Sequence, residues 1–256
     1  MEGENMFKRI GAMTVVFLWS GTVFAAHPLI TDDTGTQGKG KFQLEVNGEY
    51  AHEDEDGVTE DATEIATMLS FGIGDNVDVV LGIPCQYIRA KDPGTATREK
   101  GVSDTSLELK WRFYEKDGLS FALKPGLTLP TGDDAKGLGA GKATYGLFFI
   151  TTKEIEPWAF HLNLGYGRNE NKVDEREDIW HASLASEREL VKDLKAVANI
   201  GIETNPDRTS SAHPAFILGG LIYSLSEGLY VDFGVKGGLN KPETDYAILA
   251  GTTLRF

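Results

Sequence analysis

Cysteine is nearly absent from this chain, because Cys85 stands alone among its 256 residues. A single cysteine excludes any disulfide within the chain. Cys85 continues a series of every second residue with Leu81, Ile83 and Tyr87. A period of two places these four side chains on one face of a strand. We therefore interpret Cys85 as a small apolar side chain of that face rather than as a reactive thiol.

Long apolar runs are missing after residue 25, and a transmembrane helix needs about 20 such residues. The one apolar run, residues 10–24, follows Lys8 and Arg9 and ends in small residues at Val23 and Ala25. This arrangement predicts a secretory signal peptide over residues 1–25. An exported chain without a later helical anchor is expected in the periplasm, in the medium or in the outer membrane.

Positive charge is scarce, since 25 lysine and arginine residues face 39 aspartate and glutamate residues, for a net charge of −14. This balance argues against nucleic acid as a partner. The acidic stretch around Gly57 fails the EF-hand pattern, because Thr63 stands where the twelfth-position glutamate is needed. The five histidines lack zinc spacing and no phosphate-binding loop follows a strand, so we expect no metal and no cofactor.

Period-two alternation of apolar and polar residues is the dominant pattern. In the closing stretch, residues 245–256, the even positions are apolar with Tyr246 and Phe256 at the ends, and the odd positions end in Arg255. About twelve such segments follow one another from residue 40 to residue 256, which predicts an all-β, antiparallel, up-and-down transmembrane β-barrel. The closing strand should pair with the first strand, near residues 42–50. Residues 26–39 are predicted to be irregular, either as a plug in the lumen or as a periplasmic lead-in.

Connections between these segments alternate between short turns and long polar loops, with long loops predicted at residues 52–61 and 91–101. Outer-membrane barrels combine short periplasmic turns with longer outer loops. Aromatic residues near the ends of the apolar faces suit the membrane interfaces; they are Tyr50, Tyr87, Trp111, Phe113, Trp158, Tyr166, Trp180, Tyr223, Tyr246 and Phe256. A soluble β-sandwich also alternates, but it explains neither the turn lengths nor the export signal.

The faces opposite the apolar ones are expected to line the lumen. The lumen-lining candidates are Glu45, Glu49, Glu108, Lys110, Arg112, Lys124, His161, His181, Glu203, Asp232, Lys236 and Arg255. Because an unpaired charge in a narrow interior is costly, many of them should pair across strands. The same set suits a polar constriction that selects solutes or a lumen filled with ion pairs, and a barrel of about twelve strands lies between filled and open sizes.

His181 and Ser183 lie two residues apart on one predicted strand face, together with Glu187. A histidine beside a hydroxyl could form a nucleophile and its base. No recognisable motif surrounds the pair, so a barrel hydrolase is the weakest of the functional hypotheses and no catalytic residue is assigned.

Several stretches together resemble the outer-membrane transporter family named for the meta pathway of phenol degradation. They are HPLITDDTG (27–35) followed by GKFQLE (40–45), KPGLTLPTGD (124–133), NLGY (163–166), ETNPD (203–207) and the closing stretch. The resemblance covers nearly all of the chain after the signal peptide. It implies an outer-membrane barrel and uptake of aromatic compounds, and it supplies no binding residues.

The sequence therefore predicts a porin-like channel in the outer membrane of a Gram-negative cell, for small solutes that include hydrophobic or aromatic ones. A non-conducting structural or adhesive barrel is the alternative. The expected partners are outer-membrane lipid, lipopolysaccharide, the barrel-insertion machinery and a small-molecule solute. Phe256 is interpreted as an assembly signal read by that machinery.

Overall fold

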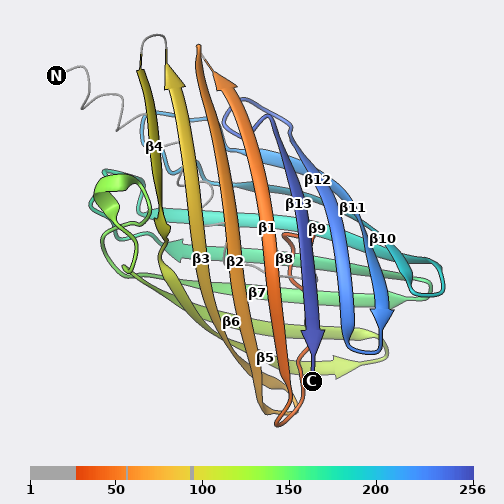
Figure 1. Ribbon diagram of the computed structural model, residues 1–256. Helices are drawn as coiled ribbons and strands as arrows, with labels where there is room; N and C mark the ends of the chain where they lie inside the picture. The colour runs from red at the N-terminus through yellow and green to blue at the C-terminus, as the bar shows by residue number, and fades with distance from the viewer. Residues whose placement is uncertain (1–26, 56, 93–94) are drawn as a thin grey trace.

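A computed structural model describes residues 27–55, 57–92 and 95–256, and the predicted signal peptide lies outside these residues. Thirteen strands and one short 3-10 helix make up the fold (Figure 1). The elements are β1 (Phe42–Glu55), β2 (Val58–Gly74), β3 (Val77–Asp92), β4 (Thr95–Val102), β5 (Thr105–Lys116), β6 (Leu119–Leu129), η1 (Asp134–Lys136), β7 (Thr144–Ile155), β8 (Trp158–Arg168), β9 (Asp178–Val191), β10 (Leu194–Glu203), β11 (Ala215–Ser226), β12 (Leu229–Gly238) and β13 (Tyr246–Arg255). No helix among these described residues is long and apolar enough to cross a membrane.

The strands form one closed antiparallel sheet. Each strand pairs with its neighbours in sequence, except that β4 and β5 do not pair with each other, and β1 closes the barrel against β13 with Gln43 opposite Arg255 and His52 opposite Tyr246. Strand β3 pairs with β5 along residues 77–82 and with β4 along residues 85–92, so β4 and β5 share one position in the wall. The barrel therefore has twelve positions, and the predicted fold class and closing pair are confirmed.

Burial alternates along the strands as the period-two pattern predicts. In β11 the outward Ile217 is 52% exposed, while the adjacent Leu218 is 1% exposed. Apolar and aromatic side chains cover the outer face, which water would not solvate favourably but lipid hydrocarbon would. The barrel is therefore built to sit in an outer membrane.

The two ends of the barrel differ. Short turns join β2 to β3, β5 to β6, β7 to β8, β9 to β10 and β11 to β12 at the end that also holds the start of β1 and the end of β13 (Figure 1). This is the periplasmic end by the usual asymmetry of such barrels. Longer loops, at residues 130–143, 169–177, 204–214 and 239–245, lie at the outer end.

The long loops predicted at residues 52–61 and 91–101 are wrong. Strands β1 and β2 continue to Glu55 and Val58, and β3 and β4 continue to Asp92 and Thr95. Polar side chains do not end a strand when backbone pairing continues, and His52 Nδ1 lies 2.8 Å from Asp61 Oδ1 across this extension.

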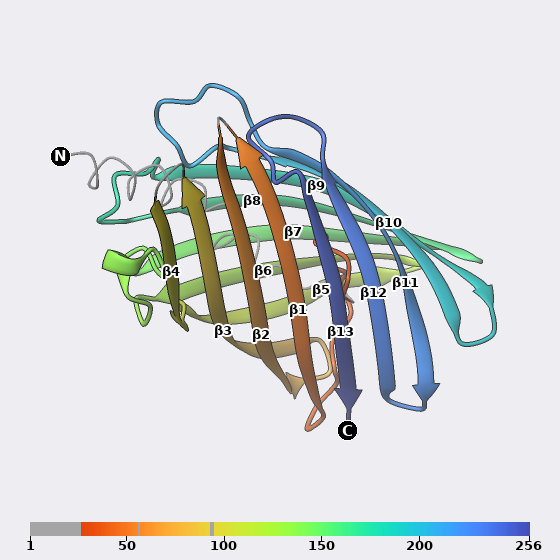
Figure 2. The same ribbon diagram turned by 45° about the horizontal axis from the view of Figure 1, so that its top comes forward.

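Residues before β1 enter the lumen. Residues 27–34 are buried, except for Asp33, which is half-buried. In both views the red segment of the ribbon lies between the front wall, formed by β1 and β13, and the strands behind it (Figures 1 and 2). We call residues 27–37 the plug segment.

Candidate functional site

Two asparagine side chains of the barrel wall hold the backbone of the plug segment. The N–H groups of Ile30 and Thr31 donate to Asn199 Oδ1 over 2.8 and 3.0 Å. The N–H of Asp32 donates to Asn163 Oδ1 over 2.7 Å, and Asn163 Nδ2 donates back to the carbonyl of Asp32 over 2.8 Å. The plug backbone has no strand partner here, so these amides satisfy groups that would otherwise be buried without hydrogen bonds.

Ion pairs with two lysines, which we call the charge clamp, hold the plug segment at Asp32 as well. Asp32 Oδ1 lies 2.9 Å from Lys110 Nζ, and Asp32 Oδ2 lies 3.1 Å from Lys124 Nζ. Lys124 Nζ also lies 3.0 Å from Glu108 Oε2. Because β5 and β6 are neighbours, the two lysines would repel each other in a buried setting without the carboxylate of Asp32 between them.

The ends of the plug segment are tied as well. His27 Nδ1 makes a short hydrogen bond with Asp232 Oδ1 on β12. The N–H of Gln37 donates to Asp78 Oδ2 on β3 over 2.9 Å. The segment thus runs from β12 past the middle of the lumen to the periplasmic end of β3, where β1 begins.

Sequence-predicted lumen candidates occupy the inward positions of their strands. Nine are buried, namely Glu45, Glu108, Lys110, Lys124, His161, His181, Glu203, Asp232 and Lys236. Glu49 and Arg112 are half-buried, and Arg255 is exposed at the periplasmic end. Some pair across strands, since Lys236 Nζ lies 3.4 Å from Glu49 Oε1 and 3.2 Å from Glu243 Oε1. Whether they contact a solute stays a prediction.

Sequence reasoning missed an apolar part of the interior. Phe216, Leu218 and Ile222 point inward from β11 and share a buried cluster with Leu29 and Ile30 of the plug segment. The outward residues of β11 are also apolar, so alternation gives a weak signal for this strand. Asn163 and Asn199 were missed too, because one asparagine on a polar face carries no pattern.

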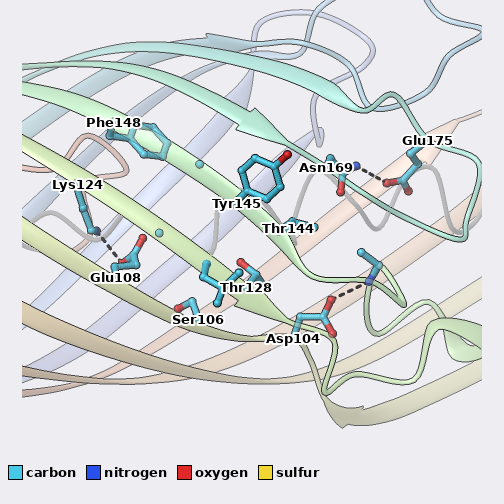
Figure 3. Close-up of a pocket in the computed structure, with 14 residues that line it drawn as sticks. Asp104, Ser106, Glu108, Lys124, Thr128, Thr144, Tyr145, Phe148, Asn169 and Glu175 are labelled. Atoms are coloured by element: carbon cyan, nitrogen blue, oxygen red, sulfur yellow. Dashed lines mark hydrogen bonds and ion pairs between the residues drawn. The ribbon is translucent and has the colours of Figure 1, made fainter.

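Two cavities lie at opposite ends of the lumen. The outer cavity, about 40 Å³, reaches from Asn169 and Glu175 in the 169–177 loop down to Glu108 and Lys124 (Figure 3). The periplasmic cavity, about 290 Å³, has His27 and Asp232 among its lining residues. Both cavities therefore end at residues that bind the plug segment, which lies between them.

His181 and Ser183 are brought together as predicted from their spacing. His181 Nε2 lies 2.9 Å from Ser183 Oγ, and His181 Nδ1 lies 3.4 Å from Glu203 Oε2, so the nearby carboxylate belongs to Glu203 rather than Glu187. All three side chains are buried. Asn163, which faces Ser183 in the sheet, donates from Nδ2 to the carbonyl of Asp32.

Within residues 27–55, 57–92 and 95–256, no group of three or more histidine, cysteine, aspartate or glutamate side chains is placed to hold a metal ion. The acidic residues 53–55 instead belong to β1.

Comparison with protein families now adds to this geometry. The profile of the family described as the MetA pathway of phenol degradation matches residues 25–256. The chain belongs to this family. The match spans the barrel and the plug segment alike, and it agrees with the resemblance found in the sequence. Comparison with curated proteins gives no match.

Solved structures share the fold of this family member. A crystal structure of the COG4313 outer membrane channel from Pseudomonas putida F1 matches with a TM-score of 0.65 and 15% identity, over 88% of this chain and 98% of that one. The translocator domain of the autotransporter NalP from Neisseria meningitidis has a TM-score of 0.53 and 10% identity, over 87% and 91%. The KdgM porin in complex with disordered oligogalacturonate has a TM-score of 0.54 and 8% identity, over 84% and 99%. The fold is that of outer-membrane barrels.

Proposed function

We propose that this chain is an outer-membrane channel that passes small solutes, and that the plug segment controls the passage. One observation carries the proposal: cavities open at both ends of the lumen, and between them lies a segment held by side-chain contacts rather than by a strand ladder. Side-chain hydrogen bonds contribute about 1 kcal/mol each in net terms, so a few of them can be exchanged reversibly.

The family description and the fold support this function. The family description refers to phenol degradation, and two of the similar structures are a channel and a porin. Small aromatic solutes are therefore the class we propose, together with lipid and lipopolysaccharide as the surroundings and the barrel-insertion machinery as the assembly partner. We propose no enzymatic activity, since the family description and the similar channel and porin structures favour transport.

A second function is favoured by the ion pairs in the lumen. Lys124 with Glu108, and Lys236 with Glu49 and Glu243, neutralise charge across the interior as a filled, non-conducting barrel would require. Such a barrel would serve as a structural or adhesive surface protein.

Conductance of the purified protein in planar bilayers separates the two functions. We expect a small conductance for the unaltered chain and a larger one for the Asn163→Ala/Asn199→Ala variant, whose plug segment loses its backbone partners. Asn76→Ala is the matched control, because the Asn76 side chain donates to the carbonyl of Arg112 and makes no hydrogen bond to the plug segment. No conductance and no solute flux in any of the three proteins would refute the channel and leave the structural barrel.

A further inference from the structure

The periplasmic cavity is large enough for an organic solute. Its volume is about 290 Å³, and a cavity of about 150 Å³ suffices to bind benzene. The inward faces of strands β9 to β13 and β1 form its walls, and it opens toward the short turn at Asp193. Of these two lumen cavities, only the periplasmic one can hold an aromatic molecule, since the outer cavity has only about 40 Å³.

Negative charge dominates the walls of this cavity. Five carboxylates line it, against two basic side chains and one histidine; the carboxylates are Glu45, Glu187, Glu189, Asp193 and Asp232. Lys195 Nζ lies 3.1 Å from Glu187 Oε1, and His27 bonds to Asp232. The other three carboxylates form no ion pair with any described residue.

Glu45 is the most enclosed of these three carboxylates. Its residue is 4% exposed, and its one hydrogen bond to a described residue is a 3.5 Å contact from Thr253 Oγ1. A carboxylate held in such a setting is poorly solvated, so a cation that enters the cavity gains more from it than from a carboxylate in water.

The buried side chain of Asn47 is a second observation that points to a ligand in this cavity. It is 4% exposed, and neither its Oδ1 nor its Nδ2 has a hydrogen-bond partner among the described residues. A Cβ atom at Gly251 would lie 2.7 Å from Asn47 Oδ1, 2.6 Å from His27 Nδ1 and 2.7 Å from Asp232 Oδ2. The Asn47 carbonyl thus lies beside two residues that line the inner end of the cavity, where it can accept a hydrogen bond.

Apolar side chains complete the lining. Leu194, Ile222 and the ring of Tyr230 face the cavity. The guanidinium of Arg255 lies 5.3 Å from the centre of the Tyr230 ring, which shows that this ring already accommodates a cation. A ligand that suits all these walls has a short hydrocarbon or aromatic body and a positively charged head.

We propose that the periplasmic cavity is a binding site for small organic cations, such as primary arylalkyl amines in their ammonium form. The ammonium group would lie near Glu45 and Asn47, and the apolar body would lie against Ile222 and Tyr230. The inference deepens the proposed channel function by naming a solute class, but binding can be measured whether or not the barrel conducts.

Calorimetric titration of the purified, full-length barrel with benzylamine at pH 8 tests the site. We expect saturable binding that is about tenfold or more tighter than that of benzyl alcohol, because one charge contact near a shielded carboxylate is worth at least about 1.4 kcal/mol. Benzoate, the matched anion, should bind more weakly than either. Added salt should weaken benzylamine binding and leave benzyl alcohol unaffected.

Two variants locate the binding. Glu45→Gln should weaken benzylamine binding by about tenfold, and Glu189→Gln at the rim of the cavity should weaken it by less. Glu115→Gln removes the same charge outside the cavity, on the half of β5 nearest the periplasm, and should leave binding unchanged. Equal affinities for benzylamine and benzyl alcohol, or an equal loss in Glu115→Gln, would overturn the site. Binding without conductance would refute only the channel, and conductance without binding would refute only this site.

Discussion

Asp32 of the plug segment and Lys124 of the barrel wall form a buried ion pair, with Oδ2 and Nζ 3.1 Å apart and side chains 1% and 2% exposed. The contact joins the irregular plug segment to the regular wall. Lys110 reaches the other oxygen of the same carboxylate. A single plug residue thus compensates two buried lysines, which makes Asp32 the strongest attachment of the plug segment.

The Asp32→Asn variant should detach the plug segment and raise the conductance. Breaking a buried pair costs about 3–5 kcal/mol when a charge is left without a partner, and the cost is lower here because Glu108 and Asp33 still pair with the two lysines. The strand ladders do not involve Asp32, so the barrel should remain folded and heat-modifiable. Single-channel recordings in planar bilayers measure the effect. Asp33→Asn is the control, because the side chain of Asp33 is 31% exposed and its contact with Lys110 is longer, at 3.4 Å. Equal conductance of the two variants would contradict the clamp.

The Gly251→Ala variant should displace the start of the plug segment. Its Cβ would lie 2.6 Å from His27 Nδ1 and 2.7 Å from Asp232 Oδ2, so these two side chains would have to separate. Overpacking of this kind costs about 1–3 kcal/mol. Hydrogen exchange of the Ile30 and Thr31 amides, which donate to Asn199, should become faster.

Gly237→Ala is the matched control for that experiment, since a Cβ there meets no other atom within 4 Å. It changes a glycine on the neighbouring strand β12 without touching the plug segment. Exchange at Ile30 that is as fast in Gly237→Ala as in Gly251→Ala would show that His27 does not depend on the space at Gly251.

The strands were predictable and the plug contacts were not, for a physical reason. Alternation such as Ile217 out and Leu218 in is imposed by a lipid face and an enclosed face, and it repeats along each strand. The plug segment has no repeat, and its partners Asn163 and Asn199 are single residues far away in the sequence. The alternation along each strand is enough to place the charged candidates on the lumen side. The pairing of Lys110 and Lys124 with Asp32, in contrast, can be seen only in the three-dimensional structure.

The predictions of long loops at residues 52–61 and 91–101 are wrong for a related reason. Residues 52–61 are rich in charge, and this polarity predicts a loop. Beyond the membrane both faces of a strand can be polar, because water solvates each of them while the backbone pairing of β1 with β2 continues. Polarity at the ends of barrel strands therefore indicates where lipid contact ends, not where the strand ends.

The outer loop at residues 169–177 should loosen as the pH rises. The pKa of Glu175 is raised from 4.5 to about 8, chiefly by burial and also by the nearby Asp207, against the opposing effect of a hydrogen bond from Asn169. In the unfolded loop the carboxyl ionises near 4.5, whereas in the folded loop it stays protonated until about pH 8. Stability is therefore full below pH 4.5 and falls as the pH rises toward 8.

Hydrogen exchange of this loop at pH 6 and pH 9, taken relative to Glu175→Gln at the same pH, measures the effect. Glutamine keeps an acceptor for Asn169 and cannot ionise, so the ratio removes the intrinsic pH dependence of exchange. We expect the ratio to be near one at pH 6 and larger at pH 9. A ratio that does not change with pH would mean that the Glu175 carboxyl is not held in its protonated form.

Deletion of Phe256 should lower the amount of barrel folded in the membrane. The Phe256 ring stacks on Phe42 with the ring centres 5.6 Å apart, and the two backbones exchange hydrogen bonds of 2.7 and 3.0 Å where β1 meets the end of the chain. Removal of the residue leaves two groups of Phe42 unpaired at the closing seam, at about 1 kcal/mol each. The heat-modifiable fraction in purified outer membranes measures folding. Phe256→Tyr keeps the ring and the backbone contacts and should fold normally, whereas Leu254→Ala tests the loss of a lipid-facing side chain next to the seam. Normal folding of the deletion variant would refute the role of Phe256 in assembly.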